Sequence, residues 1–141
     1  MQSVAAVRKA NRPWIAGVPT DIRIKRIYES AQTCDGARVL VDRLWPRGLR
    51  KDAAALTCWH KNVAPSPALR RWFGHDPARW EVFRARYRAE LAVNADALEP
   101  LCKLARPGPL TLLYGARDSR HNHAVVLAQY LYEYLEENKT S

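Results

Sequence analysis

The part of the chain that decides the fold is the stretch Arg38-Val-Leu-Val-Asp-Arg-Leu-Trp-Pro-Arg-Gly48. It begins with the continuous apolar run Val39–Val41, which is typical of a buried strand. Charged and aromatic residues follow at once, and Pro46-Arg-Gly48 indicates a turn. Apolar residues that stop where charges begin predict a strand whose carboxyl end opens at the surface. Ligands of α/β sheets bind at that end of the strands, so this stretch also predicts a place for a ligand.

Three further segments have strand character. Residues 22–28 alternate apolar and basic side chains, which predicts a strand at a border of the sheet. Residues 57–63 are a weaker candidate for a third strand. Residues 110–114 are continuously apolar, which predicts a central strand covered on both faces. The strand at 22–28 and the strand at 37–42 either form a hairpin or are separated by an excursion of the chain, and the sequence does not decide between these arrangements.

Helix punctuation is clear in the second half of the chain. Ser66 and Pro67 predict the start of a helix over 68–73, and Gly74 predicts its end. A second helix is expected from Asp76-Pro77, with one apolar stripe. A further helical stretch ends before Pro107, and a last helix is expected from about His121 to Glu137. Residues 49–56 are expected to be a short helical or irregular piece.

This order of elements predicts an α/β fold, a small and largely parallel sheet of about four strands with helices on its faces. The 141 residues fit one domain, which we expect over 21–141. Residues 1–20 are expected to be a flexible leader or an artificial extension, with a weakly basic targeting arm as the alternative.

Composition indicates an anionic partner and a reducing compartment. The net charge is +9, and 17 of the 23 basic residues are arginine, which binds carboxylate or phosphate in a bidentate fork. A merely solvated basic surface is the alternative explanation. Three widely spaced cysteines favour a reduced, cytoplasmic protein. The sequence has no stretch of ~18 apolar residues, so we expect no membrane span. The oligomeric state stays open.

Several motifs together resemble those of a known family. They are Lys25-Arg-Ile-Tyr28, Asp42-Arg-Leu-Trp-Pro-Arg-Gly48, Trp72-Phe-Gly-His-Asp76, and Leu112-Leu-Tyr114 followed by Arg117-Asp118 and His121-Asn-His123. With them the chain resembles the YeaO-like branch of domain-of-unknown-function family 488 over about residues 22–135. The resemblance implies a compact cytosolic α/β protein of bacteria or archaea, and it brings no activity with it.

A candidate site arises if the strands ending near Asp42 and Tyr114 are parallel. The polar residues that follow the two strands then meet at one edge of the sheet. Histidine suits acid or base work near neutral pH, and an aspartate can orient it. Arginine can clamp an anion, the start of a helix favours one, and tryptophan can stack on a base. The catalytic candidates are His123, His121 and Asp42. The ligand-binding candidates are Arg43, Trp45, Arg47, Arg117, Asp118, Ser119, Asn122 and His75.

The alternative is that these residues serve the fold, as helix caps and internal ion pairs. We expect no metal, because His121 and His123 would point about 200° apart on a helix and no further ligands cluster with them. We expect no cofactor, since a glycine-rich loop after the first strand is missing.

Two functions are compatible with this site. The first is a small protein that binds a phosphorylated or nucleotide-like ligand. This hypothesis includes a hydrolase or transferase that acts on the ligand. The second is a nucleic-acid-binding module that uses the arginine-rich helical region between Arg70 and Arg88.

Overall fold

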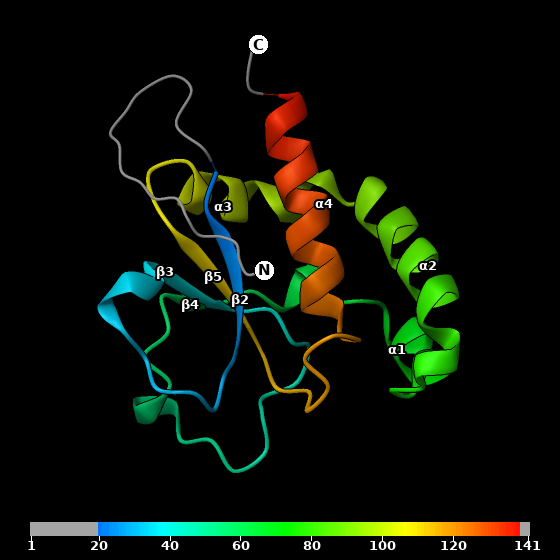
Figure 1. The fold of residues 1–141 in the computed structure, drawn as a ribbon, viewed down its shortest axis with the longest axis horizontal. Helices are drawn as coiled ribbons and strands as arrows, with labels where there is room; N and C mark the ends of the chain where they lie inside the picture. Colours follow the sequence, from blue (N-terminus) through cyan, green and yellow to red (C-terminus); the bar gives the residue numbers. More distant parts are fainter. Residues whose placement is uncertain (1–19, 139–141) are drawn as a thin grey trace.

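The computed structural model describes residues 20–138, and within them four parallel strands form one sheet (Figure 1). The strands are β2 (Ile22–Arg26), β3 (Ala37–Leu40), β4 (Cys58–Trp59) and β5 (Leu110–Tyr114). Their order across the sheet is β2-β5-β3-β4, and each neighbouring pair is parallel. The chain therefore has the predicted α/β fold. The prediction of a leader over residues 1–20 falls almost wholly on residues outside the described range.

The four predicted strands are all present, and their places in the sheet follow from their side chains. β5 lies between β2 and β3 with all five residues buried, as its continuous apolar run predicted. β2 lies at a border of the described sheet, which agrees with its alternating pattern. β4 is shorter than the stretch 57–63, because only Cys58 and Trp59 pair with β3 before residues 61–63 turn into a 3-10 helix. β2 and β3 do not form a hairpin, since β5 separates them.

The helices are α1 (Pro67–Phe73), α2 (Trp80–Ala92), α3 (Ala95–Ala105) and α4 (His123–Glu137). α1 has the predicted punctuation. The Ser66 hydroxyl accepts from the N–H of Leu69 at 3.2 Å, and Gly74 ends the helix in the left-handed conformation. Residues 51–53 form a 3-10 turn within an otherwise irregular segment, as expected for 49–56.

The two faces of the sheet are covered in different ways. On one face, strand residues such as Val39, Leu112 and Tyr114 join the main core with buried side chains of all four helices. On the other face, Leu40 and Leu113 pack against Trp45, Leu49 and Leu56 of the irregular segment between β3 and β4, and against Trp59 of β4. The segment that begins with the predicted polar stretch thus also covers a second, smaller core.

A buried ionic cluster occupies the amino-terminal part of the same face. The carboxylate of Asp35 lies 3.1 Å from the Lys25 ammonium group and 2.6 Å from the guanidinium of Arg38. Arg38 also donates to the backbone carbonyls of Ala54 and Ala55. The side chains of Asp35 and Arg38 are only 6% and 7% exposed, so this cluster holds the turn at 33–36 and the segment before β4 against the sheet.

Candidate functional site

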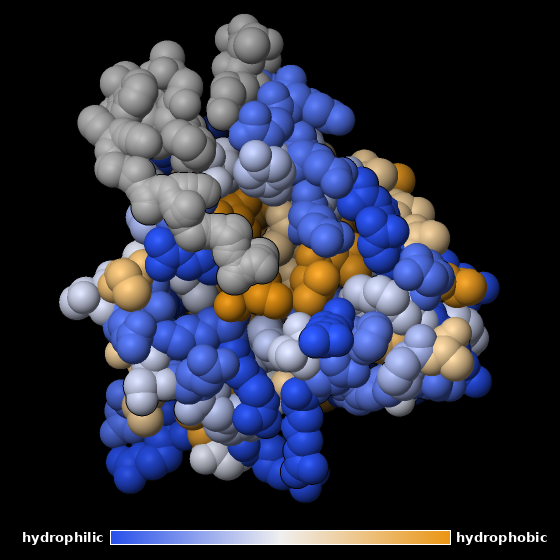
Figure 2. Space-filling model, in the orientation of Figure 1, coloured by the Kyte–Doolittle hydropathy of each residue, from blue (hydrophilic) through white to orange (hydrophobic). Residues whose placement is uncertain are grey.

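The carboxyl ends of the parallel strands and the start of α4 meet at one edge of the sheet. This edge, with the loops 27–32, 41–57 and 115–122, forms the lower part of the molecule in Figure 1. The space-filling view in Figure 2 shows that this part of the surface is largely hydrophilic. The parallel arrangement thus brings together the two polar stretches that follow β3 and β5, as the sequence predicted.

Asp42 and His123 lie side by side at this edge. One carboxylate oxygen of Asp42, Oδ2, accepts from the backbone N–H of Gly115 at 2.9 Å. The other, Oδ1, lies 3.2 Å from Nε2 of His123 and has no well-aligned hydrogen bond in the described part of the chain. Nε2 itself lies 2.9 Å from the carbonyl oxygen of Val41. A carbonyl only accepts, so Nε2 carries a proton, and His123 ties the first turn of α4 to the end of β3.

Asp118 organises the turn that leads into α4. Its carboxylate accepts from the backbone N–H groups of Arg120 and His121 and contacts the imidazole of His121 at 2.9 Å. These hydrogen bonds, led by the one from the Arg120 backbone, lower the pKa of Asp118 to about 2. The His121 ring packs edge-on against Trp80, with ring centroids 5.3 Å apart. Asp118 and His121 therefore form a pair, and it is separate from the pair made by Asp42 and His123.

Asn122 is the cap of α4, which begins at His123 and not at His121 as the sequence suggested. Its side-chain oxygen accepts from the N–H of Val125 at 3.2 Å, and its amide nitrogen donates to the carbonyl of Asp118 at 2.9 Å. Asn122 is buried, so both amide contacts are shielded from water. The helix start that was expected to attract an anion already has an acceptor from the chain itself.

Replacing Asn122 with alanine is expected to lower the free energy of unfolding by about 1–2 kcal/mol, because a buried cap and its second hydrogen bond are lost together. Urea unfolding followed by circular dichroism measures the change. Ser119→Ala is the matched control in the same loop, since Ser119 is exposed and its hydroxyl has no partner among residues 20–138. Equal stability of the two variants would contradict the capping role.

Arg43, Trp45 and His75 have structural contacts of their own. Arg43 donates to the backbone carbonyls of Ala64 and Pro65. Trp45 donates to the carbonyl of Leu49 at 2.7 Å and meets Trp59 edge-to-face. His75 is exposed beyond the end of α1, where its ring contacts Phe73. The structure shows no contact between His75 and the other predicted site residues.

Arg47 and Arg117 are the predicted ligand-binding residues whose guanidinium groups are exposed and without a partner in the described part of the chain. Arg26 of β2 and Tyr28, which follows this strand, connect the loops that carry Arg47 and Arg117. The hydroxyl of Tyr28 donates to the carbonyl of Arg47 at 2.7 Å. The guanidinium of Arg26 lies 4.6 Å from the centre of the Tyr28 ring and donates to the carbonyl of Ala116 at 3.0 Å. The loops that carry Arg47 and Arg117 are thus both tied to the packed side chains of Tyr28 and Arg26.

Tyr28 and Arg26 were not among the predicted site residues, although both belong to the motif Lys25-Arg-Ile-Tyr28. Tyr28 is 42% exposed as a residue, while its hydroxyl and one ring face are held by contacts within the chain. An aromatic ring that is fixed and still accessible is a better stacking surface than Trp45, which lies against Trp59.

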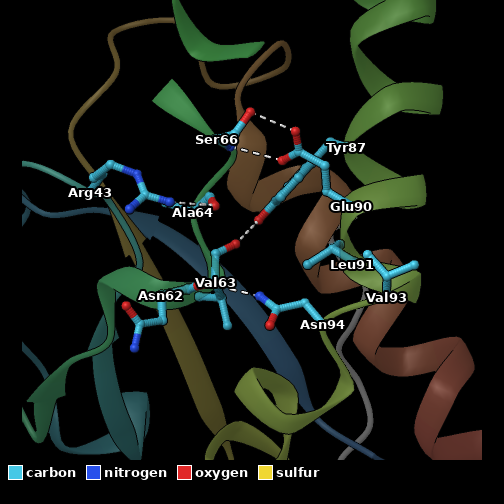
Figure 3. A pocket seen from close by; sticks show the side chains of 10 residues that line it. All are labelled: Arg43, Asn62, Val63, Ala64, Ser66, Tyr87, Glu90, Leu91, Val93 and Asn94. Atoms are coloured by element: carbon cyan, nitrogen blue, oxygen red, sulfur yellow. Dashed lines mark hydrogen bonds between the residues drawn. The ribbon is translucent and has the colours of Figure 1, made fainter. Parts of the chain in front are cut away.

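A shallow hollow of about 380 Å³ lies next to this edge, between the segment 62–66 and the second half of α2 (Figure 3). Arg43 is the one predicted residue that lines it. Its floor includes Tyr87, whose hydroxyl donates to the carbonyl of Val63 at 2.5 Å. Burial raises the pKa of Tyr87 well above its ordinary value; Glu90 and Asp42 add to this effect and Arg43 opposes it.

Two general features of the described residues bear on the kind of site. No group of three or more His, Cys, Asp or Glu side chains in residues 20–138 is placed to hold a metal ion. No helix in the same range has both the length and the apolar character needed to cross a membrane.

Fold and edge together define a small α/β protein with a four-stranded parallel sheet, a basic carboxyl edge and histidines committed to structural contacts. The chain belongs to the DUF488-N3i family, described as the inactive DUF488-N3 subclade, and the match covers residues 21–141. This agrees with the family resemblance carried by the sequence motifs.

Relatives of the chain include three bacterial proteins. It is 45% identical over 111 residues to the uncharacterized protein YeaO of Escherichia coli (strain K12), which covers 79% of this chain and 96% of YeaO. It is 46% identical over 112 residues to the uncharacterized proteins Mb3100c of Mycobacterium bovis and Rv3073c of Mycobacterium tuberculosis (strain H37Rv), covering 79% of this chain and 94% of each of them. The search of solved structures found no match.

Proposed function

We propose that this protein binds a phosphorylated, nucleotide-like small molecule at the carboxyl edge of its sheet without transforming it. The observation that carries the proposal is the arrangement around Tyr28. Contacts from Tyr28 and Arg26 hold the loops of Arg47 and Arg117 together, and both of these guanidinium groups are unpaired in the described chain. Guanidinium groups without a carboxylate partner are well suited to a phosphate, which accepts two parallel hydrogen bonds from each of them.

Two carboxylates at this edge, those of Asp42 and Asp118, are engaged within the fold, whereas the guanidinium groups of Arg47 and Arg117 are not. Asp42 accepts from Gly115 and lies beside His123, and Asp118 is engaged by its own turn and by His121. Arg26 donates to a backbone carbonyl and pairs with no carboxylate of the described chain. The edge therefore favours an anion, and the free face of Tyr28 favours one with an aromatic base.

Binding without catalysis is supported by the state of the two histidines and by the family description. Nε2 of His123 is committed as a donor to Val41, and His121 is held by Asp118 and Trp80. A general base needs a free lone pair directed at a substrate. The DUF488-N3i family is described as an inactive subclade. A hydrolase or transferase activity would appear in the experiment below as turnover of the bound compound.

Arg47→Ala and Arg117→Ala are each expected to weaken binding of adenosine monophosphate about 10- to 100-fold, because each removes charge-assisted hydrogen bonds to the phosphate. Isothermal titration calorimetry of the full chain measures the affinities, and nuclear magnetic resonance of the ligand reports any turnover. Arg106→Ala is the matched control, since Arg106 follows α3 at the opposite edge of the sheet and pairs with Glu99. Equal loss in all three variants, or tight binding in both site variants, would overturn the proposal.

The alternative function is binding of nucleic acid by the arginine-rich helical region. Arg79 and Arg86 lie over the ring of Trp72, and Arg88 pairs with Glu133, so part of this positive charge is used within the fold. A short single-stranded oligonucleotide in the same titration separates the two functions. Affinity for it that falls steeply between two salt concentrations and is lost in Arg70→Ala would favour the helical surface.

A cytoplasmic location is part of the proposal. Cys34 and Cys58 are exposed free thiols and Cys102 is a buried one, and a reducing compartment keeps such groups unpaired. Phosphorylated small molecules are also abundant there. Fractionation of cells that produce the tagged protein tests this location.

A further inference from the structure

The hollow between the segment 62–66 and α2 contains one positive and one negative side chain that do not pair with each other. Figure 3 shows Arg43 on one side of it and Glu90 on the other. Neither forms an ion pair with any side chain of residues 20–138. Both are half-buried, which makes an uncompensated charge more costly than it would be on the open surface.

Each of these charged groups is held in place by the backbone or by a neutral side chain. Arg43 donates from Nε to the carbonyl of Pro65 at 3.3 Å and from Nη2 to that of Ala64 at 3.2 Å. A guanidinium has five N–H groups, so three are left for a ligand. Glu90 accepts from the N–H and the hydroxyl of Ser66 at 2.8 and 2.6 Å. Each of its oxygens retains a free lone pair for a further donor.

The rest of the hollow combines an apolar floor with an amide rim. Val63, Tyr87 and Leu91 are almost fully buried, whereas Val93 at the rim is 88% exposed. The amide of Asn94 donates to the backbone carbonyl of Asn62 at 3.1 Å, which fixes this side of the rim. Arg43 and Glu90 both line this hollow together with Tyr87.

We propose that this hollow is a second binding site, and that its ligand is a small zwitterion with one ammonium and one carboxylate group, of the amino-acid or dipeptide class. The carboxylate binds Arg43, the ammonium binds Glu90, and an aliphatic side chain packs against Val93 at the rim. A ligand with both charges compensates both protein groups at once, whereas a ligand with one charge leaves the other group uncompensated. The site is separate from the phosphate site, since it uses neither Arg47 nor Arg117.

The experiment titrates the full chain with L-leucine and with L-leucyl-glycine, followed by two-dimensional nuclear magnetic resonance of the labelled protein. N-acetyl-L-leucine lacks the ammonium group and L-leucinamide lacks the carboxylate, so each removes one of the two charge contacts. We expect at least one of the zwitterions to shift the amide signals of residues 62–66 and 90–94, with each blocked leucine derivative at least tenfold weaker than the zwitterion that binds.

Two variants complete the test. Glu90→Gln keeps an oxygen acceptor for Ser66 and is expected to weaken the zwitterion at least tenfold without weakening N-acetyl-L-leucine. Val93→Trp alters an exposed rim position and is expected to abolish binding by filling the hollow while the melting temperature stays unchanged. Arg106→Ala is the control for the loss of a surface charge elsewhere. Three results would overturn the proposal: blocked derivatives that bind as well as the zwitterions, silence of residues 62–66 and 90–94 for both zwitterions at about 10 mM, which is ten times a dissociation constant of about 1 mM, or full binding by Val93→Trp.

Discussion

Gly36→Ala is expected to destabilise the protein by about 4 kcal/mol or more, which corresponds to a loss of roughly 15 °C in melting temperature. Gly36 has a positive φ of 67°, and a Cβ atom at this position would lie 2.3 Å from the carbonyl oxygen of Pro109. The same oxygen accepts from the N–H of Ala37 at 3.0 Å, where β3 first meets β5. Relief of the clash therefore requires the two central strands to move apart at their start.

A series of glycine variants separates the clash from the backbone conformation. Gly48 has a φ of 77° with open space around it, so Gly48→Ala is expected to cost only the conformational part, about 1–2 kcal/mol. Gly108 has neither a positive φ nor a close neighbour, and Gly108→Ala is expected to be neutral or slightly stabilising. Calorimetry is expected to give the highest melting temperature for Gly108→Ala, a lower one for Gly48→Ala and the lowest for Gly36→Ala. A Gly36 variant as stable as the Gly48 variant would exclude the clash with Pro109.

Asp35→Asn is expected to lower the free energy of unfolding at pH 7 by about 3–5 kcal/mol, because it leaves the two buried cations Lys25 and Arg38 without their shared anion. The matched control is Asp52→Asn, which breaks an ion pair with Arg50 whose side chains are 81% and 72% exposed. This control is expected to change stability by less than about 0.5 kcal/mol. Urea unfolding of both variants measures the difference.

The cost of Asp35→Asn also depends on pH in a defined direction. Burial by itself would raise the pKa of Asp35, but hydrogen bonds from the Gln32 backbone, Lys25 and Arg38 outweigh it and lower the pKa below its ordinary value. The carboxylate therefore stabilises the fold fully above its unfolded pKa, and this contribution is lost as the pH falls through the lower folded pKa. The wild type and the variant should differ most at neutral pH and converge as the pH falls below the lowered pKa of Asp35. A difference that grows on acidification would contradict the proposed role of the ionised carboxylate.

The sequence was sufficient where one residue and its neighbours determine the structure. The apolar run of β5 predicted a central strand, and Ser66, Pro67 and Gly74 predicted both ends of α1, because each of these signals acts within about one turn of chain. The parallel sheet also followed from the order of elements, and with it the meeting of the Asp42 and Asp118 loops at one edge.

Contacts between distant residues could not be predicted in the same way. The ion pair of Asp35 was not predicted, since its partner Lys25 lies ten residues earlier, on β2. Glu90 was not among the predicted site residues, since its partner Ser66 lies 24 residues earlier in the chain. Asn122 was placed in the site and proved to be the helix cap, because several polar residues before α4 were equally good candidates for that role.

The position of β5 has a consequence for the way the protein forms in the cell. β5 is the last strand of the described chain and lies between β2 and β3, which do not pair with each other. At about 5–20 residues per second, a ribosome needs roughly 4–14 s to extend the chain from Leu40 to Leu110, and during that time β2 and β3 lack their shared neighbour. The apolar side chains of β3 are exposed throughout this interval. The sheet is therefore expected to assemble only once β5 has been made, and chains truncated before β5 should be aggregation-prone and rely on chaperones.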